Sequence, residues 1–589
     1  MEEENINNTI WIEGLKNAIK FEGKAQEKAI IGKLIATFPE IRLKLKDIVP
    51  SIKSIVSEIN NLSLDKQKEK LLSLDPSALE KKEKTQEVKE LPELPNVNKY
   101  NKVIMRLAPY PSGALHIGNA RMIVLNDEYV KRYEGELILF YDDTIGSSKS
   151  KRDDPKAKYV LPEAYDLIKE GLDWLDVKYH KVYYKSDRLN TYYKYCMQLL
   201  EENNAYVCSC SGNDFREKYK KIKKDCPHRN NTSDKNLEEW DKMLNGPYRE
   251  MEAVVRLKTG MDQKDPALRD QVIMRISEAE HPKVGIKYRV WPMLEFSWGI
   301  DDHLIGVSHI LRGSDLIKED IIEKYIWDFL GWDSCEFMHY GRLSFPDRKL
   351  SKTLARNAIS RGEYTGWDDP RSWSLQSLKK RGIRAEALRE ALLNLGLSLS
   401  GITFSDNWLY AKNSELIDSI SDRYFFVSNP VKLGVQELPF EEIIAKPLIL
   451  PSNPKKGTRS IHCTVENGKL DLYIAYNDAK TLVKGRELRL KDLCNIKIKE
   501  ISKKNNKIIE IKSEFTSKAL DRDLKIIHWI PNEEKLNVQV LRDNGQYDEG
   551  YGEINLAKIP MNKTIQFERY GFVNPIELIG DKLFCYFTH

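Results

Sequence analysis

Residues 103–143 read VIMRLAPYPSGALHIGNARMIVLNDEYVKRYEGELILFYDD. The segment opens with the apolar run VIMRLA, continues through a loop rich in turn residues, and then shows helical spacing from Asn119. GELILFYDD is a second apolar run of strand length. A strand, a helix and a second strand in this order form a βαβ unit. The sequence therefore predicts a parallel sheet with a right-handed crossover.

The loop PYPSGALHIG lies where the first predicted strand gives way to the helix. Gly113 and Gly118 allow the backbone to approach a ligand closely, and the helix start offers unpaired N–H groups to a phosphate. His116 and Asn119 add side-chain donors for the charge that spreads over an α-phosphate during transfer. A tight turn around a packed histidine would give the same pattern, and a lone glycine-rich loop does not decide between the two.

A second polar segment, DRKLSKTLA, occupies residues 347–355. Lys349, Ser351 and Lys352 on a mobile loop could clamp a triphosphate and neutralise the leaving pyrophosphate. The alternative is an ordinary solvated basic loop. Together with residues 113–119, this segment favours a triphosphate-binding site over two unrelated loops.

These two segments resemble the HIGH and KMSKS motifs of class I aminoacyl-tRNA synthetases, and they stand here as HIGN and KLSKT in the same order. Asn119 replaces the second histidine, and Thr353 replaces the final serine. Further stretches resemble the glutamyl and glutaminyl branch. The stretches are RLAPYPSGALHIGNAR, WPMLEF, DDHLIGVSHILRG, GWDDPR at 366–371, and KKRGIRAEAL. From about residue 430, short β-like runs alternate with Asn, Gly and Asp turns, and this β-rich tail, with IHWIPNEEKLNVQVL and IQFERYGFV, resembles the anticodon-binding barrels of the archaeal-type enzymes in the branch.

The resemblance implies an amino-acid pocket in which arginine forks hold glutamate. Arg106 matches the arginine of the R-x-A-P motif, and Arg312 matches a second arginine that glutaminyl enzymes lack. Asp142 would hold the substrate ammonium group. Either arginine could instead form a surface salt bridge, and the aspartate could instead cap its loop. The pocket departs from the family pattern at Leu294, where a tyrosine is usual, and at Phe140, where an arginine is usual.

The implied reaction has two steps. Glutamate and ATP, with Mg²⁺, give glutamyl-adenylate and pyrophosphate, and the acyl group then passes to the 3′ terminal adenosine of tRNA(Glu). The resemblance leaves open whether tRNA(Gln) is also charged. Two alternatives remain, a glutaminyl-tRNA synthetase and a non-catalytic RNA-binding relative that keeps the fold.

Four potential zinc ligands are spaced C-x-C-x15-C-x-H, namely Cys208, Cys210, Cys226 and His228. Two close pairs of thiolate and imidazole ligands flanking a loop suit tetrahedral zinc. Some glutamyl enzymes have a zinc site in this insert, which abuts the acceptor end of tRNA. Four reduced, unligated side chains are the alternative.

The chain is expected to be an α/β multidomain protein. We expect a Rossmann-type parallel-sheet catalytic domain with an insert, preceded by a helical module and followed by C-terminal β-barrel anticodon-binding domains. Residues 64–98 are rich in lysine and glutamate and indicate a mobile linker. The expected boundaries are 1–98 for the helical module and linker, 99–205 and 281–340 for the two catalytic halves, 206–280 for the acceptor-end insert, 341–430 for the lysine loop and helical connection, and 431–589 for the barrels.

The 589 residues carry 94 Lys and Arg against 89 Asp and Glu, a net charge of +5 that permits a nucleic-acid partner without demonstrating one. No run of about 18 apolar residues and no signal peptide is visible, so we expect a cytoplasmic protein without membrane contact. The eight cysteines then read as reduced thiols or metal ligands. We expect the chain to be a monomer.

Overall fold

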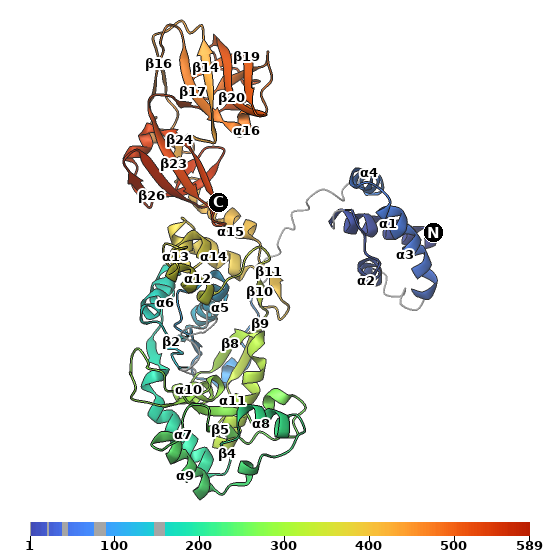
Figure 1. Cartoon of the computed structure of the whole chain (residues 1–589), viewed down its shortest axis with the longest axis vertical. Helices are drawn as coiled ribbons and strands as arrows, with labels where there is room; N and C mark the ends of the chain where they lie inside the picture. The colour runs from blue at the N-terminus through green and yellow to red at the C-terminus, as the bar shows by residue number, and fades with distance from the viewer. Residues whose placement is uncertain (1, 21–22, 38–44, 76–89, 146–158) are drawn as a thin grey trace. The chain divides into compact units, whose positions relative to one another are not determined.

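The structure is a computed structural model, and it describes residues 2–20, 23–37, 45–75, 90–145 and 159–589. The chain divides into two compact units, Met1–Glu87 and Val88–His589 (Figure 1). In the described ranges, no helix combines the length and the apolar character that crossing a bilayer requires.

The N-terminal unit is helical, as predicted. Its described helices are α1 (Glu2–Lys20), α2 (Glu27–Thr37), α3 (Leu45–Asn60) and α4 (Leu64–Leu74). The linker prediction was wrong for residues 64–74, because α4 packs against α1 through the fully buried Leu71. Gln67 is also fully buried and donates to the Ile59 carbonyl at 2.8 Å. Residues 76–89 of the predicted linker lie outside the described residues.

The catalytic sheet confirms the predicted βαβ unit. The strands are β1 (Ile104–Leu107), β2 (Glu136–Tyr141), β3 (Lys181–Tyr184), β8 (His309–Gly313) and β9 (Glu336–Tyr340). β2 pairs parallel with β1 and β3, and β8 pairs parallel with β9. β8 lies on the other side of β1, where the Ser308 N–H donates to the Ile104 carbonyl at 2.9 Å. The strand order therefore switches direction at β1, and ligands of open parallel sheets bind beyond the carboxyl ends at such a point.

Helix α5 (Ile117–Arg132) connects β1 to β2. The helical periodicity of the sequence predicts helices at 156–175 and 188–204, and α6 (Pro162–Trp174) and α7 (Leu189–Glu201) fall within these ranges. The predicted helical stretch began at 156, and its first three residues lie outside the described part of the chain. The first hydrophobic core joins this sheet and α5 to the helices that follow residue 370, including the buried Leu139, Leu375 and Leu388.

The insert forms its own four-stranded antiparallel sheet, in the order β4-β5-β6-β7. Its strands are β4 (Ala205–Cys208), β5 (Val254–Leu257), β6 (Val272–Ile276) and β7 (Val290–Pro292). This sheet extends beyond the expected boundary at residue 280. Residues 288–313, YRVWPMLEFSWGIDDHLIGVSHILRG, have a sheet-like sequence texture, which β7 and β8 confirm at the two ends, but Leu294–Ile305 between them is helix α10. Helix α11 (Ile317–Leu330) follows β8.

The lysine segment is partly helical, unlike the predicted loop. Lys349 is exposed in a loop, but helix α12 begins at Lys352 and ends at Ser360, with the Ser351 hydroxyl accepting from the Leu354 N–H at its start. The rest of the connection consists of α13 (Leu375–Lys380), α14 (Ala385–Leu393), α15 (Asp406–Ile417) and the parallel pair β10 (Leu343–Ser344) and β11 (Ile402–Thr403).

Two seven-stranded sheets form the C-terminal region, as predicted for β-barrels (Figure 1). One has the order β21-β18-β19-β20-β14-β17-β22 and surrounds a core that includes Trp529. The other has the order β12-β25-β26-β27-β23-β24-β13 and contains the last strand of the chain. The strands of the first are β14 (Pro430–Gln436), β17 (Leu470–Ala475), β18 (Glu487–Leu490), β19 (Cys494–Lys504), β20 (Lys507–Ser517), β21 (Ile526–Ile527) and β22 (Ile530–Pro531); those of the second are β12 (Arg423–Tyr424), β13 (Phe426–Ser428), β23 (Lys535–Leu541), β24 (Tyr547–Glu553), β25 (Ile565–Phe567), β26 (Gly571–Ile579) and β27 (Lys582–Phe587).

Candidate active site

The loop beyond the carboxyl end of β1 leads into helix α5 through a capping box. His116 is the N-cap, and its Nδ1 accepts a hydrogen bond from the Gly118 N–H at 3.1 Å. In return, the Asn119 side-chain oxygen accepts from the His116 N–H at 3.2 Å. The two residues predicted to contact phosphate are thus adjacent, and they also satisfy donors at the helix start.

Because Nδ1 of His116 accepts a hydrogen bond, the neutral imidazole carries its proton on Nε2 and can donate it to a ligand. Burial, assisted by the positive charge of Lys352, lowers the pKa of His116 to about 4. The histidine is therefore neutral near pH 7, and its Nε2 is available as a hydrogen-bond donor without a positive charge.

A strap formed by residues 366–375 supports this loop from behind. The Ile117 N–H donates to the Trp373 carbonyl at 3.1 Å, and the Leu375 N–H donates to the Leu115 carbonyl at 2.8 Å. Gly113 has a φ of +141°, and a Cβ placed on it would come within 2.1 Å of the Trp367 ring. The strap contains the GWDDPR motif, so this motif shapes residues 113–119, the predicted phosphate loop. The sequence of the motif alone did not indicate this role.

The lysine segment and the phosphate loop face each other. The Lys352 ammonium group donates to the Tyr110 carbonyl in PYPSGALHIG at 3.0 Å. The preceding loop is held by Arg348, which pairs with Asp406 and stacks over the Trp373 indole with its Cζ 3.6 Å from the ring centroid. Lys352 thus lies against the loop that carries Gly113, His116, Gly118 and Asn119, and Ser351 and Lys349 precede it by one and three residues.

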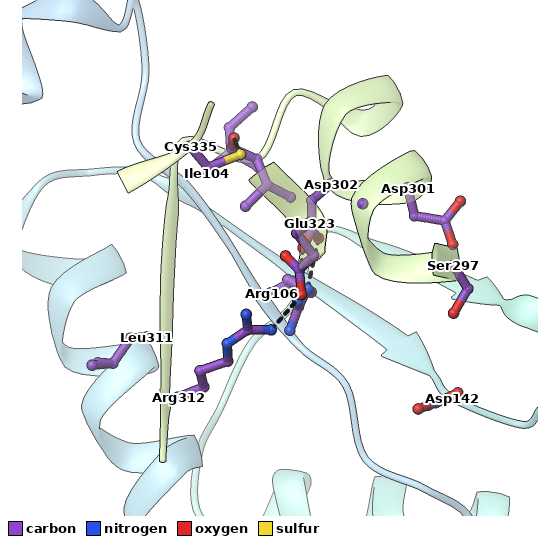
Figure 2. A network of polar contacts seen from close by, with 12 residues as sticks. Ile104, Arg106, Asp142, Ser297, Asp301, Asp302, Leu311, Arg312, Glu323 and Cys335 are labelled. Carbon is purple, nitrogen blue, oxygen red and sulfur yellow. Dashed lines mark hydrogen bonds and ion pairs between the residues drawn. The ribbon is translucent and has the colours of Figure 1, made fainter. Parts of the chain in front are cut away.

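The two predicted glutamate-binding arginines are buried and lie close together (Figure 2). Arg106 of β1 forms a two-pronged pair with Asp302 of α10, at 2.6 Å from Nε and 2.7 Å from Nη2. Arg312 of β8 donates from Nε to Asp320 of α11 at 2.9 Å and from Nη1 to Glu323 at 2.7 Å. Both charges are therefore compensated by the protein itself, not by the surface salt bridges considered from the sequence.

The indole of Trp298 joins the two arginines, with its centroid 4.5 Å from the Arg106 Cζ and 5.1 Å from the Arg312 Cζ. Burial alone would lower the pKa of Arg106, but the Asp302 carboxylate raises it above its ordinary value. Burial raises the pKa of Glu323 to about 8, against the attraction of Arg312. The pocket is therefore a dense charged network with one carboxyl group that is easily protonated.

The third predicted contact, Asp142, follows β2 and is also paired. The Lys185 ammonium group lies 3.3 Å from an Asp142 oxygen and donates to the Ser297 hydroxyl at 2.6 Å. Lys185 is completely buried, and this burial lowers its pKa against the attraction of Asp142. The neighbouring Asp143 accepts from the Ser186 backbone at 2.9 Å, so it caps the loop.

Sequence reasoning missed Lys185, Trp298, Asp320 and Glu323. Asp302 stands within DDHLIGV, which was noted for its resemblance but not for its pairing. A lysine directly after a strand carries no local sequence signal that it will form a buried ion pair. The same is true of acids on one face of a helix. The structure also accommodates the two residues that differ from the family pattern. Phe140 is buried and stacks on Tyr183, and Leu294 is the first residue of α10.

The four predicted metal ligands converge. The ligand atoms of Cys208, Cys210, Cys226 and His228 all lie within 4.8 Å of one another. The Cys226 sulfur is 3.7 Å from that of Cys208 and 3.9 Å from that of Cys210, and His228 Nδ1 is 3.4 Å from Cys210 and 3.5 Å from Cys226. His228 Nε2 contacts the Ser209 hydroxyl at 2.9 Å, which orients the ring and leaves Nδ1 facing the sulfurs.

Three family models match the chain in succession. The catalytic domain of class I tRNA synthetases (E and Q) matches residues 102–416, and two anticodon-binding domains of the same class match residues 421–516 and 526–575. A glutamate–tRNA ligase of Pyrococcus abyssi is 42% identical over 582 residues, covering 98% of both chains. One of Methanocaldococcus jannaschii is 41% identical over 578 residues, again covering 98% of both, and one of Methanopyrus kandleri is 37% identical over 595 residues, covering both in full. The chain therefore belongs to the glutamyl and glutaminyl (E and Q) class I tRNA synthetases.

Proposed function

We propose that this class I tRNA synthetase is a glutamate–tRNA ligase. It activates glutamate with ATP to glutamyl-adenylate and transfers the glutamyl group to the 3′ terminal adenosine of tRNA(Glu). The observation that carries the proposal is the approach of Lys352 to the loop that contains His116, because adenylyl transfer needs donors on both sides of the phosphates. The glutamate–tRNA ligases that match the whole chain support the choice of amino acid.

We assign the ATP end of the reaction to the residues around the start of α5 and α12. Gly113 and Gly118 let the triphosphate approach the backbone, and His116 Nε2 and the Asn119 amide donate to the α-phosphate oxygens. Lys352 and Lys349 neutralise the pyrophosphate as it leaves, and Ser351 begins the helix that presents Lys352. Mg²⁺ bound with ATP would add positive charge to the leaving pyrophosphate. The glutamate carboxylate can then attack the α-phosphorus without a protein nucleophile.

We assign the glutamate end to Arg106, Arg312 and Asp142. Arg106 and Arg312 stand near the carboxyl ends of β1 and β8, and Asp142 directly follows β2, which supports a site with two guanidinium forks and one carboxylate. A substrate with two carboxylates and one ammonium group has the complementary set of charges. Arg312→Ala should raise the KM for glutamate at least about tenfold, with a smaller effect on the KM for ATP, because a charge-assisted hydrogen bond contributes about 1.5–3 kcal/mol.

The deciding experiment is charging of fractionated tRNA with labelled glutamate or labelled glutamine. Charging of tRNA(Glu) with glutamate alone supports the proposal, and parallel charging of tRNA(Gln) with glutamate would broaden the tRNA range. Charging with glutamine alone would establish the glutaminyl alternative. A folded protein that binds tRNA but catalyses no ATP–pyrophosphate exchange with either amino acid would be the non-catalytic relative. Sedimentation during the same preparation tests the expected monomer.

We also propose that Cys208, Cys210, Cys226 and His228 hold a zinc ion. Zn–S bonds of about 2.3 Å in a tetrahedron separate the sulfurs by roughly 3.8 Å, close to the spacing found here. The site would fix the loop between residues 210 and 226 to β4. Metal analysis should give one zinc per chain, lost in Cys226→Ser and kept in Cys463→Ser, a buried cysteine of the barrel region. A chain without zinc before any chelation would rule out the site.

A further inference from the structure

Each charged group that glutamate would present already has a counterpart from this chain in the pocket. The Asp302 carboxylate binds the guanidinium group of Arg106, and the Glu323 carboxyl group binds the Nη1 edge of Arg312. The Lys185 ammonium group pairs with the Asp142 carboxylate. Binding of glutamate must therefore exchange one set of ion pairs for another. Affinity then depends on how readily the internal partners leave.

Glu323 is the internal partner that is held least firmly. It is fully buried on α11, yet only its Oε1 accepts a hydrogen bond, from Arg312 Nη1 at 2.7 Å. Its Oε2 has no hydrogen-bond partner among the described residues. Asp320, by contrast, accepts from both Nε and Nη2 of Arg312 through one oxygen, and its other oxygen lies 2.9 Å from His339 Nε2. A buried carboxyl oxygen without a partner costs free energy, so displacing Glu323 sacrifices less than displacing Asp320.

We propose that Glu323 is a specificity-determining residue of the amino-acid site. Its carboxyl group holds the Nη1 edge of Arg312 in the free protein, and the side-chain carboxylate of the substrate takes this place on binding. The inference rests on the proposed function, because it requires that Arg312 receive the substrate side chain. Asp320 stays on Nε and Nη2 of Arg312 throughout and keeps the fork oriented.

Charge decides when this exchange is favourable. Four charged or titratable groups surround Glu323: Arg312 of β8, Arg106 of β1, Asp302 of α10 and Cys335 of the loop before β9. An ionised Glu323 beside an incoming carboxylate would place two like charges on one guanidinium edge. The protonated form avoids this repulsion, and it predominates below about pH 8. The KM for glutamate should therefore rise as the pH passes through this value.

Glu323→Gln tests the proposal, because the amide imitates the protonated carboxyl group at every pH. The assay is ATP–pyrophosphate exchange in the presence of tRNA at pH 7 and pH 9, with saturating ATP. The wild-type KM for glutamate should rise about tenfold more over this interval than that of Glu323→Gln, as expected for one group with a pKa near 8 that must be protonated. At pH 7 the two values should agree within about twofold. Any loss of the substrate ammonium proton affects both proteins equally and cancels in the ratio.

Asp328→Asn is the matched control, since it removes an exposed carboxylate from the same helix. It should reproduce the wild-type pH dependence. Glu323→Met, similar in length and uncharged, provides a second test if Glu323→Gln unfolds at lower temperature than the wild type. Equal pH dependence of the glutamate KM in folded Glu323 variants and wild type would overturn the proposal. Absence of glutamate-dependent exchange in the wild type would instead count against the proposed function, so the two failures are distinguishable.

Discussion

Gly113→Ala tests whether the strap fixes the geometry of the phosphate loop. The glycine has a φ of +141°, a backbone conformation that residues with a side chain rarely adopt. An added Cβ would lie 2.1, 2.7 and 2.8 Å from three atoms of the Trp367 ring. The Trp367 backbone cannot retreat easily, because its carbonyl accepts from the Ser372 hydroxyl at 3.0 Å and from the Ser374 hydroxyl at 2.5 Å.

The expected cost has two parts. The backbone conformation costs an alanine about 1–3 kcal/mol, and forcing a methyl group into a filled site costs about 1–3 kcal/mol more. The variant should therefore lose about 2–6 kcal/mol of unfolding free energy, or shed the strain by moving the loop. Such a movement would displace the donors at His116 and Gly118, and a misplacement of about 1 Å can cost on the order of a hundredfold in rate.

Thermal unfolding and ATP–pyrophosphate exchange measure these two outcomes. Trp367→Leu removes the ring edge, so Gly113→Ala and Trp367→Leu combined should recover the steric part and retain the backbone part. Gly401→Ala is the control, because the nearest atom to its added Cβ is 3.7 Å away. Unchanged stability and unchanged exchange rate in Gly113→Ala would show that the loop does not depend on the strap.

Three further outcomes are expected. Asp302→Asn should destabilise the protein by about 3–5 kcal/mol, because it leaves Arg106 buried without its counter-charge, as thermal unfolding can measure. The pKa of His116 falls from 6.5 to about 4 on folding, so between these values the unfolded state binds one proton more than the folded state. The wild type should therefore lose up to about 3 kcal/mol of unfolding free energy as the pH falls from about 6.5 to 4, and His116→Asn should lose less. Acid titration of both proteins would contradict this if the curves were parallel. Lys352→Ala should slow exchange at least about tenfold with little change in the KM for glutamate, and an equal effect on both would argue against a role at the phosphates.

The βαβ unit could be predicted because its determinants are local. Residues 104–107 and 136–141 are apolar runs of strand length, and the helix between them has caps and periodicity within a few residues. The approach of Lys352 to residues 113–119 was expected because the two segments together resemble a known pair of motifs. Their separation in the sequence alone gives no information on their distance in space. The barrels were predictable for the same local reason, since their strands alternate buried and exposed residues, as in β14 and β17.

Helix α10 was mistaken for sheet because it is buried over most of its surface. Seven consecutive residues, Phe296–Asp302, are buried, so no polar face marks the helical period. Helix α4 was mistaken for a linker for the opposite reason. It is rich in lysine and glutamate, and its buried residues are limited to Gln67 and Leu71. Tertiary contacts determine both segments, and neither contact is visible in the local pattern.

The charge pairing of the pocket was equally hidden from the sequence. Arg106 and Asp302 are 196 positions apart, and Arg312 pairs with two acids in the first two turns of α11. Matching the arginines to family motifs predicted that they share one site, but it supplied none of their partners. The identity of the partners matters for function, because a paired guanidinium attracts a substrate carboxylate less than an unpaired one does.

One buried indole connects the two halves of the proposed ATP site. Trp373, itself in the left-handed region with a φ of +51°, accepts the N–H of Ile117 through its carbonyl and carries Arg348 on its ring. The start of α5 and the loop before α12 therefore rest on the same residue. A movement of Lys352 away from the predicted phosphate loop must either break the stacking of Arg348 on Trp373 or occur about a hinge that follows Arg348 in the chain. Since the cation–π contact and the Asp406 pair both hold Arg348, we expect the pivot to lie between Arg348 and Lys352, where Lys349 is exposed and unconstrained by secondary structure.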